Sequence, residues 1–310
     1  MQKIIIFKHG GGELANQLWN YISVYAWSLE EKALLSNPSF YEYHSQFTLL
    51  HKEAWPVKIL ARFFGDYRGR KQNFWKKTWR NMYSIYTKLT EIFKGAAIIS
   101  SENSTNQVTY LPPTSNRSEL KSSTLNSSKV YMSGWLFRNP VGLEKYRKEI
   151  LENFAPKAVI VNRIDSLAAD LRKKYSKVIG IHIRQWDYKT WKGGKYWIEQ
   201  KRIREIINQY AKLNNLSLAS TVFLIMSDGS IETECFKGLN IHISKENAVT
   251  DLFLLSKTDV VIGSDSSFGH LASWLGNIPH IVLKNEDIDW EYYKDKKKYF
   301  QNKYCTMVHF

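Results

Sequence analysis

The C-terminal half of this 310-residue chain alternates short apolar runs with helical patterns, and this alternation limits the possible folds more than any other feature. Apolar runs of four to seven residues have the length of buried strands. Strand, helix and strand at this spacing predict a doubly wound, mostly parallel α/β sheet. We expect strands at 178–183, 221–227, 240–243, 260–263 and 280–283. We expect helices at 199–213, 231–236, 250–256 and 268–275.

The N-terminal half is less regular. We expect strands at 3–7 and 130–133, and helices at 14–30 and 143–154. Residues 100–128 are rich in Ser, Asn, Thr and Pro, which predicts a flexible loop. We place a domain boundary near Pro156, which gives domains 1–155 and 156–310, and a helix at 159–175 leads into the second domain.

Cysteine content and charge restrict the compartment and the partners. Two cysteines, Cys235 and Cys305, cannot build a disulfide framework or a four-cysteine zinc site, which favours a reducing compartment. No signal peptide and no run of about 18 apolar residues is evident, so we expect a cytoplasmic protein. The net charge of +15 indicates an anionic partner. Without a nucleic-acid-binding signature, we expect a phosphorylated substrate or an anionic bilayer rather than nucleic acid.

The segment 67–94 concentrates that charge. It holds eight Lys or Arg and one acid, Glu91, so it carries a net charge of +7. Aromatic and apolar residues within it fall on one stripe of a predicted helix, at positions 75, 79, 82, 86, 89 and 93. Two interpretations stay open. The stripe covers the core of the protein, or it lies on an anionic membrane or a lipid-linked acceptor.

Three glycines at 10–12 follow the first predicted strand. Such a turn lets the backbone approach a ligand closely, and the following helix offers free N–H groups to an anion. The dinucleotide motif GxGxxG is not spelled out, and no GK[ST] follows as in a P-loop. Gly12 is therefore a candidate donor-site residue, with a purely structural turn as the alternative.

His182, Arg184 and Asp187 lie at the end of a predicted strand. A guanidinium at this place suits a diphosphate, because it forks onto two oxygens and keeps its charge. The alternative is that Arg184 and Asp187 form a local ion pair.

Two further strand ends carry polar residues. Ser266, Ser267 and Phe268 open a predicted helix, where hydroxyl groups welcome phosphate oxygens or act as simple N-caps. Asp228 ends another strand, and Asp251 lies in a helix start where capping is the alternative role.

Together these segments resemble the α1,2-fucosyltransferases of glycosyltransferase family 11 and the wider group of HxRxxD fucosyltransferases. The matches follow the family's order and span residues 5 to 277, although each is short. They are LANQLWNY at 14–21 for GGLGNQLFQYA, YMSGW at 131–135 for a YxDGY-type strand end, HIRQWDY at 182–188 for HIRRGDY, MSD at 226–228 for FSD, residues 251–256 for DLYLMS, and residues 265–275 for NSSFSWWGAWL.

The resemblance implies a GT-B arrangement of two Rossmann-like domains facing a central cleft, a GDP-fucose donor, inversion at the anomeric carbon and no metal. It implies that Arg184 holds the β-phosphate, and that His182 and Asp251 recognise guanine. Asp251 would pair with the N–H edge of the base. Asn16 would lie at the reaction centre. The diphosphate would be lined by Ser266, Ser267 and Phe268.

The sequence departs from the family at three places. Gln185 replaces the second Arg of HIRRGDY, and Trp186 replaces its Gly. Glu13 introduces a carboxylate three residues before Asn16, a spacing similar to that of the base in protein O-fucosyltransferases of the second type. Inverting transfer needs a general base for the acceptor hydroxyl. We expect Glu13 to be that base, with Asp187 as the second choice.

The sequence therefore predicts an inverting, metal-independent GDP-fucose glycosyltransferase of bacterial-type surface glycan synthesis. We expect it in the cytoplasm or at the inner face of the membrane, acting on a glycan acceptor that is free or lipid-linked. Three alternatives stay open: a transferase of the same fold with another nucleotide sugar, a non-catalytic nucleotide-sugar or glycan-binding protein, and a membrane-peripheral interaction protein.

Overall fold

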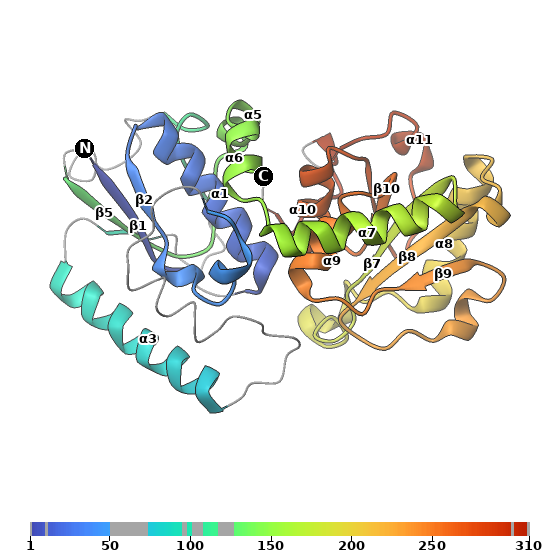
Figure 1. Cartoon of the computed structure of the whole chain (residues 1–310), viewed down its shortest axis with the longest axis horizontal. Coiled ribbons are helices and arrows are strands. Elements are labelled where there is room, and N and C mark those ends of the chain that lie inside the picture. Colours follow the sequence, from blue (N-terminus) through green and yellow to red (C-terminus); the bar gives the residue numbers. More distant parts are fainter. Residues whose placement is uncertain are drawn as a thin grey trace. The chain divides into compact units, whose positions relative to one another are not determined.

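The computed structural model describes residues 2–9, 12–49, 74–94, 98–100, 108–116, 127–298 and 301–308, except for the side chains of 74–77, 79, 93, 94 and 98–100. The chain divides into two compact units, Met1–Lys157 and Ala158–Val308 (Figure 1). The division lies two residues after the predicted boundary at 155. Most of the predicted loop 100–128 lies outside the described residues, so its flexibility stays a prediction.

The second unit contains a five-stranded sheet in which every neighbouring pair is parallel. Its strands are β7 (Lys177–Ile183), β8 (Thr221–Ser227), β9 (Asn240–Ile243), β10 (Val260–Gly263) and β11 (His280–Val282). All five predicted strands are confirmed, with bounds that differ by at most one residue. The order β11-β10-β7-β8-β9 is the Rossmann order, in which the chain changes direction across the sheet between β7 and β10.

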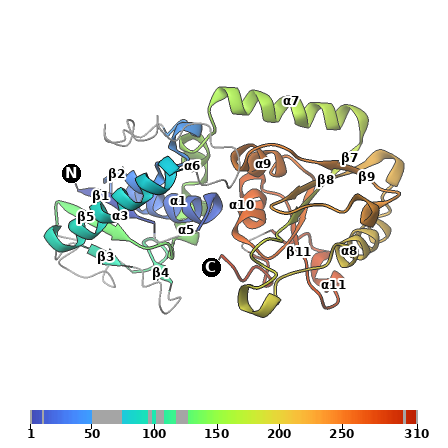
Figure 2. The same cartoon turned by 90° about the horizontal axis from the view of Figure 1, so that it is seen from below.

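Helices cover both faces of this sheet, which is why its strands are mostly apolar. Figure 2 shows α7 (Ala158–Lys174) and α9 (Ala248–Leu255) on one side, and α8 (Gln200–Leu213) and α11 (Trp290–Tyr293) on the other. A further helix, α10 (Ser267–Gly276), follows β10. The predicted helix at 231–236 is instead a 3₁₀ turn, Thr233–Phe236.

The two faces of the sheet pack differently. Ile179 and Ile181 of β7 join Ile203 and Ile207 of α8 in one buried cluster. On the opposite face, a Cβ added at Gly180 would lie 2.5 Å from Leu255 Cδ1, so only glycine allows this close approach of α9. The strand is thus tightly covered on both sides, and polar residues are left to the strand ends.

The first unit contains a four-stranded parallel sheet in the order β2-β1-β5-β3. Its strands are β1 (Lys3–Lys8), β2 (Leu34–Ser36), β3 (Ile98–Ser100) and β5 (Lys129–Ser133). A short two-stranded pair, β4 (Thr109–Tyr110) with β6 (Phe137–Arg138), lies in the same unit. The helix predicted at 14–30 is confirmed as α1 (Leu14–Glu30).

The single helix predicted at 143–154 is wrong. The chain forms α5 (Pro140–Lys145) and α6 (Arg147–Asn153), which are separated at Tyr146 with φ −108° and ψ 24°. The Tyr146 hydroxyl donates a hydrogen bond of 2.5 Å to Glu30 of α1. This tertiary contact holds the break, and its partner lies 116 residues away in the sequence.

The basic aromatic segment forms a 21-residue helix, α3 (Phe74–Lys94). Three members of its predicted stripe are exposed: Met82 by 54%, Tyr86 by 47% and Leu89 by 49%. The interpretation that the stripe covers the core is therefore wrong for these three residues. The other three members have side chains outside the described ones. No helix in the described part of the chain is long and apolar enough to span a bilayer.

Candidate functional site

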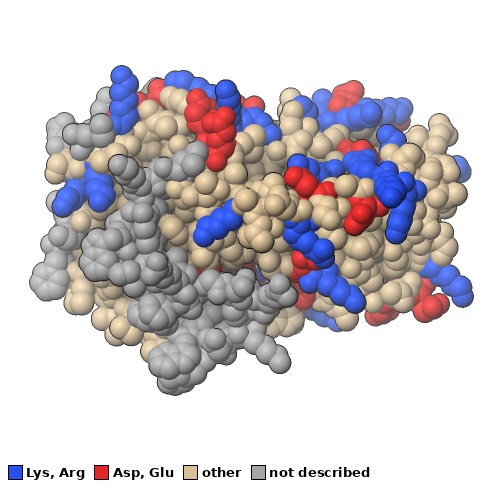
Figure 3. Space-filling model, viewed as in Figure 1, with Lys and Arg blue, Asp and Glu red and all other residues tan. Residues whose placement is uncertain are grey.

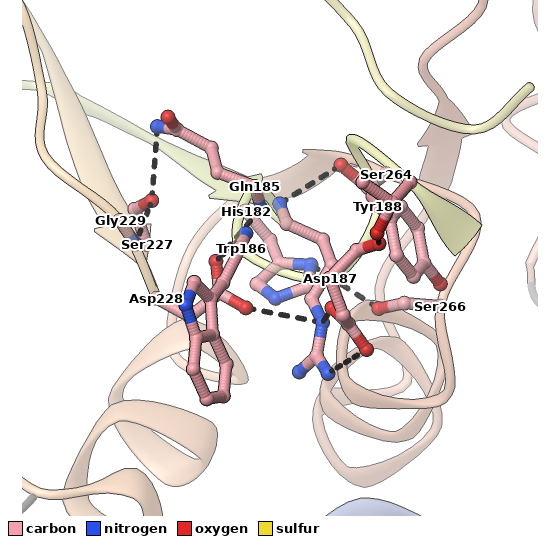
Figure 4. Close-up of polar contacts among 12 residues, drawn as sticks. His182, Gln185, Trp186, Asp187, Tyr188, Ser227, Asp228, Gly229, Ser264 and Ser266 are labelled. Atoms are coloured by element: carbon pink, nitrogen blue, oxygen red, sulfur yellow. Dashed lines mark hydrogen bonds and ion pairs between the residues drawn. The ribbon is translucent and has the colours of Figure 1, made fainter. Parts of the chain in front are cut away.

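The candidate site lies at the carboxyl edge of the second sheet, where strand order reverses. β7 and β10 are neighbours, with His182 opposite Gly263. Because parallel strands end at the same edge, the loops after β7, β8 and β10 meet there. The structure thus brings together six predicted site residues, namely His182, Arg184, Asp187, Asp228, Ser266 and Phe268. Figure 4 shows the polar contacts at this edge.

Arg184 is held by two carboxylates. Its Nε and Nη2 donate to Oδ1 and Oδ2 of Asp187, each at 2.9 Å, and Nε also lies 3.1 Å from Oδ2 of Asp228. The local ion pair with Asp187, an alternative that the spacing left open, is therefore present. Burial lowers the pKa of the Arg184 guanidinium, but its hydrogen bonds to Asp187 and the charge of Asp228 outweigh this and raise it. The guanidinium is a fixed cation at every accessible pH.

Asp228 organises the loop that follows β7. One of its carboxylate oxygens accepts hydrogen bonds from the backbone N–H of Gln185 at 2.7 Å and of Trp186 at 3.3 Å. The Gln185 side-chain amide donates to Ser227 Oγ at 3.2 Å and to the Ser230 carbonyl at 3.1 Å. The Gln185 amide thus makes its hydrogen bonds within the protein, and the Trp186 side chain is 65% exposed.

His182 is a buried neutral ring. It stacks on Phe268, with ring centroids 5.0 Å apart and planes 22° apart, and its Nδ1 lies 3.4 Å from Ser266 Oγ. Burial lowers the pKa of His182 to about 3. The ring therefore offers a hydrogen-bonding nitrogen without a charge, as recognition of an uncharged base would require.

The start of α10 borders the same edge. Ser266 is the N-cap residue, but its side chain makes no capping hydrogen bond. Ser267 and Phe268 begin the helix and are half-buried. The backbone N–H groups in the first turn of a helix point beyond its N-terminus, and the helix dipole there attracts anions. This turn can therefore receive phosphate oxygens.

Three residues of this edge were not assigned a role from the sequence, although Tyr188 and Asp265 lie within the quoted motifs and Ser264 directly follows a predicted strand. Ser264 Oγ accepts from the backbone N–H of Arg184 at 3.0 Å. The Tyr188 hydroxyl donates to the Asp265 carbonyl at 2.9 Å, and the Arg184 guanidinium lies 5.6 Å from the Tyr188 ring centre. These contacts join the loops after β7 and β10. Their position directly after two strands was the signal that could have indicated them.

The Asp265 carboxylate anchors the C-terminal segment. It accepts from the backbone N–H groups of Thr306 at 3.2 Å and Met307 at 3.3 Å, and lies 3.1 Å from His270 Nε2. Burial raises the pKa of Asp265, but the adjacent His270 and the hydrogen bonds from Thr306 and Met307 outweigh it and lower the pKa. Within the described residues, His270, His280 and Cys305 could hold a metal ion, since one ligand atom from each lies within 4.8 Å of the others.

Asp251 lies in the first turn of α9, and its Oδ1 accepts a hydrogen bond of 2.5 Å from Ser244 Oγ. Burial raises the pKa of Asp251 to about 7. Near neutral pH this carboxyl group is therefore present in both protonation states. The contact described for its carboxylate is with Ser244 and not with His182, so the predicted recognition of guanine by His182 and Asp251 stays untested.

The remaining candidates belong to the first unit. Gly12 has φ +82°, and a Cβ there would lie 2.5 Å from Asn16 Nδ2, so only glycine fits beside Asn16. Glu13 is exposed, and its carboxylate accepts from the Tyr43 hydroxyl at 3.0 Å. Burial, and next the charge of Glu13, raises the pKa of Tyr43 well above its ordinary value. Gly10 and Gly11 lie outside the described residues.

The excess positive charge does not form one patch on the face seen in Figure 3. Lys and Arg side chains lie over both units there and are interspersed with Asp and Glu.

Two Rossmann-like parallel sheets in succession give this protein a GT-B-type α/β fold. Its structure is similar to that of a point variant of Arabidopsis thaliana FUT1 in complex with GDP, with 13% identity and a TM-score of 0.56 over 92% of this chain and 71% of that one. It is also similar to NodZ α-1,6-fucosyltransferase soaked with GDP-fucose, with 15% identity and a TM-score of 0.52 over 93% and 97%.

NodZ from Bradyrhizobium likewise shares 15% identity and a TM-score of 0.52, over 92% of this chain and 96% of that one. No protein-family model and no curated relative matches the sequence. At these identities the similarity concerns the fold, so the activity has to be argued from the site.

Proposed function

We propose that the protein is an inverting glycosyltransferase that moves fucose from GDP-fucose to a hydroxyl group of a glycan. The observation that carries this proposal is the position of Arg184 at the point where the strand order reverses, beside the start of α10. Ligands of open parallel sheets bind at this point. Similarity in fold to structures with bound GDP or GDP-fucose supports the choice of donor.

The diphosphate has to compete with the carboxylates that hold Arg184. Asp187 has a side chain 47% exposed, whereas that of Asp228 is 16% exposed and accepts two backbone hydrogen bonds. Asp187 is therefore the partner that an incoming diphosphate would displace, and Asp228 would keep the loop in place. In this arrangement the Arg184 guanidinium exchanges the Asp187 carboxylate for the diphosphate, and both partners accept two hydrogen bonds from it. The exchange therefore costs little in desolvation.

The reaction is a single displacement. The acceptor oxygen forms a bond to the anomeric carbon as the bond from that carbon to the β-phosphate oxygen breaks. The acceptor proton passes to a carboxylate, and GDP leaves with its new negative charge next to Arg184 and the N–H groups of α10. Stabilisation of the charge that develops on the leaving group is the main contribution expected from these groups.

Glu13 is our proposed base. Its carboxylate is exposed and accepts from the neutral hydroxyl of Tyr43, whereas both oxygens of Asp187 accept from Arg184. A carboxylate that neutralises a guanidinium is the poorer proton acceptor. Asn16, next to Gly12, would orient the acceptor or the sugar. Asp187 stays the alternative base, because displacement by the diphosphate would free its oxygens.

Further parts of the proposal concern the biological setting. We expect transfer without a metal ion, because a guanidinium and a helix N-terminus supply the positive potential that a metal supplies elsewhere. We expect a glycan acceptor, free or lipid-linked, in bacterial surface glycan synthesis in the cytoplasm.

A transferase for another nucleotide sugar is the second candidate. Arg184 stands between two carboxylates, and Gln185 contributes no charge. Trp186 presents a large exposed ring beside it. These features suit a donor that carries less negative charge where it contacts this edge, or a donor with a different base or sugar.

A turnover assay with a panel of nucleotide sugars tests the proposal. We expect release of nucleotide from GDP-fucose in the presence of a glycan acceptor, and much slower release from GDP-mannose, UDP-glucose and dTDP-rhamnose. Faster turnover of another donor would favour the second candidate. GDP binding without turnover of any donor across a broad acceptor panel would indicate a non-catalytic binding protein.

A further inference from the structure

The helix α3 presents an apolar row to solvent. Among its described side chains, Met82, Ile85, Leu89 and Ile92 are 54%, 59%, 49% and 70% exposed, and Tyr86 is 47% exposed. Their spacings of three and four residues place them along one face of the helix. A row of this length on one element is more than the scattered apolar residues of an ordinary surface.

The opposite face of α3 is anchored to the first unit by polar contacts. Arg80 donates to both carboxylate oxygens of the buried Glu42, at 2.6 and 3.0 Å. The Tyr83 hydroxyl donates to the Phe7 carbonyl at 2.5 Å. Glu91 pairs with Lys8 at 3.4 Å.

An ordinary amphipathic helix buries its apolar face and exposes its polar face. Among the described side chains of α3, the apolar row is exposed and the polar residues that anchor the helix contact the rest of the first unit. Thr87 and Thr90 are 3% and 7% exposed, while their neighbours Tyr86 and Leu89 are about half exposed. Burial of apolar side chains normally provides the energy that docks a helix. Here the Arg80–Glu42 ion pair fixes the orientation of α3 with its apolar row outward. Rotation of the helix about its axis would leave the buried Glu42 carboxylate without its guanidinium partner. The outward row is therefore fixed by the fold.

The charge of α3 indicates what covers this row. The helix contains five Lys or Arg and one Glu, a net charge of +4, in a chain with a net charge of +15. Within that set, Arg80 and Glu91 are neutralised by partners in the first unit, and the charge that remains comes from lysines. A second copy of so basic a chain would be repelled. Anionic lipid head groups would attract the lysines while the apolar row enters the acyl boundary.

We propose that α3 is a membrane-docking helix that lies in the plane of an anionic bilayer surface. Its apolar row enters the interface, with the exposed Lys88, which precedes Leu89 of the row, at the level of the head groups. The first unit is thereby held at the lipid surface through Arg80, Tyr83 and Glu91. This inference does not depend on the proposed transferase activity, so either can fail without the other.

Co-sedimentation with vesicles of phosphatidylcholine and phosphatidylglycerol tests the proposal on the full chain. We expect binding that is weak on pure phosphatidylcholine vesicles. It should also fall when NaCl is raised from about 0.1 M to about 1 M, which shortens the Debye length from about 10 Å to about 3 Å. The triple variant Met82→Gln, Leu89→Gln and Ile92→Gln should lower the partition coefficient at least about tenfold.

The second unit offers a matched control. Val159, Leu213 and Leu218 are exposed by 74%, 55% and 37%, so replacing these three with Gln removes similar apolar surface elsewhere. We expect vesicle binding and thermal unfolding of this control to match the wild type. Thermal unfolding of the α3 variant should also match, because its three positions are exposed.

Three results would overturn the proposal: no sedimentation with anionic vesicles, equal binding to neutral and anionic vesicles, or unchanged binding of the α3 triple variant. Light scattering tests the alternative that a second copy of the chain covers the apolar row. A concentration-dependent dimer that the α3 triple variant abolishes would assign the row to contact between two copies and also reject the bilayer.

Discussion

Replacing Arg184 by Lys should strongly lower kcat/KM without unfolding the protein. The guanidinium makes two parallel hydrogen bonds of 2.9 Å with Asp187 and lies 3.1 Å from Asp228. A lysine ammonium can keep the charge near Asp228 but cannot fork onto two oxygens, either of Asp187 or of a diphosphate. We expect a loss of about 2–4 kcal/mol in transition-state stabilisation. This corresponds to a decrease of about 30- to 900-fold in kcat/KM.

Arg172 provides the matched control for this substitution. It also pairs with an aspartate, donating to both oxygens of Asp259 at 3.0 and 2.8 Å, but it lies on α7. Steady-state kinetics with GDP-fucose should show that Arg172→Lys leaves kcat/KM unchanged. Thermal unfolding should show both variants folded. If Arg184→Lys retained wild-type kcat/KM, Arg184 would be a structural ion-pair residue and would not stabilise the leaving diphosphate.

Three further predictions concern the base, the nucleotide and the metal. Glu13→Gln should lower kcat by about 10²–10⁴-fold with GDP affinity retained; if Asp187→Asn does this instead, Asp187 is the base. Because burial raises the pKa of Asp251 to about 7, its carboxylate forms as pH rises through that value. If guanine N–H groups donate to this carboxylate, calorimetry should show that the GDP affinity of the wild type rises with pH. The affinity of the Asp251→Asn variant should not rise, and this variant also serves as the control for titration of the nucleotide itself. Activity should survive EDTA, and strict dependence on Mn²⁺ or Mg²⁺ would reject the metal-free mechanism.

The sheet of the second unit could be predicted from the sequence because four of its five strands, all except the edge strand β9, are buried along almost their whole length. Runs such as 178–183 and 221–227 are mostly apolar and are followed by a charged residue, Arg184 or Asp228, so their limits are marked locally. Helix α1 was predicted from a long apolar pattern after a glycine turn. The break between α5 and α6 was missed because the Glu30 that holds Tyr146 is distant in the sequence.

The candidate site was predictable in its members but less so in its contacts. The pairing of Arg184 with Asp187 follows from a spacing of three residues, so it could be stated as an alternative. The role of Asp228 depends on the parallel pairing of β7 with β8, which no local pattern specifies. The outward orientation of α3 likewise depends on a contact between residues that are distant in the sequence. Its periodicity predicts two faces, but Glu42, which decides the inner one, lies 38 residues from Arg80.

Nucleotide-dependent thermal unfolding tests the central claim most directly, namely that the carboxyl edge of β7 and β10 binds a guanine nucleotide diphosphate. A ligand that binds only the folded protein at about 100 times its Kd adds about 2.7 kcal/mol to the free energy of unfolding. We predict that GDP raises the unfolding temperature of the wild type by several degrees, that UDP and dTDP do not, and that Arg184→Lys reduces the GDP effect. An equal or larger shift with UDP or dTDP would contradict the claim.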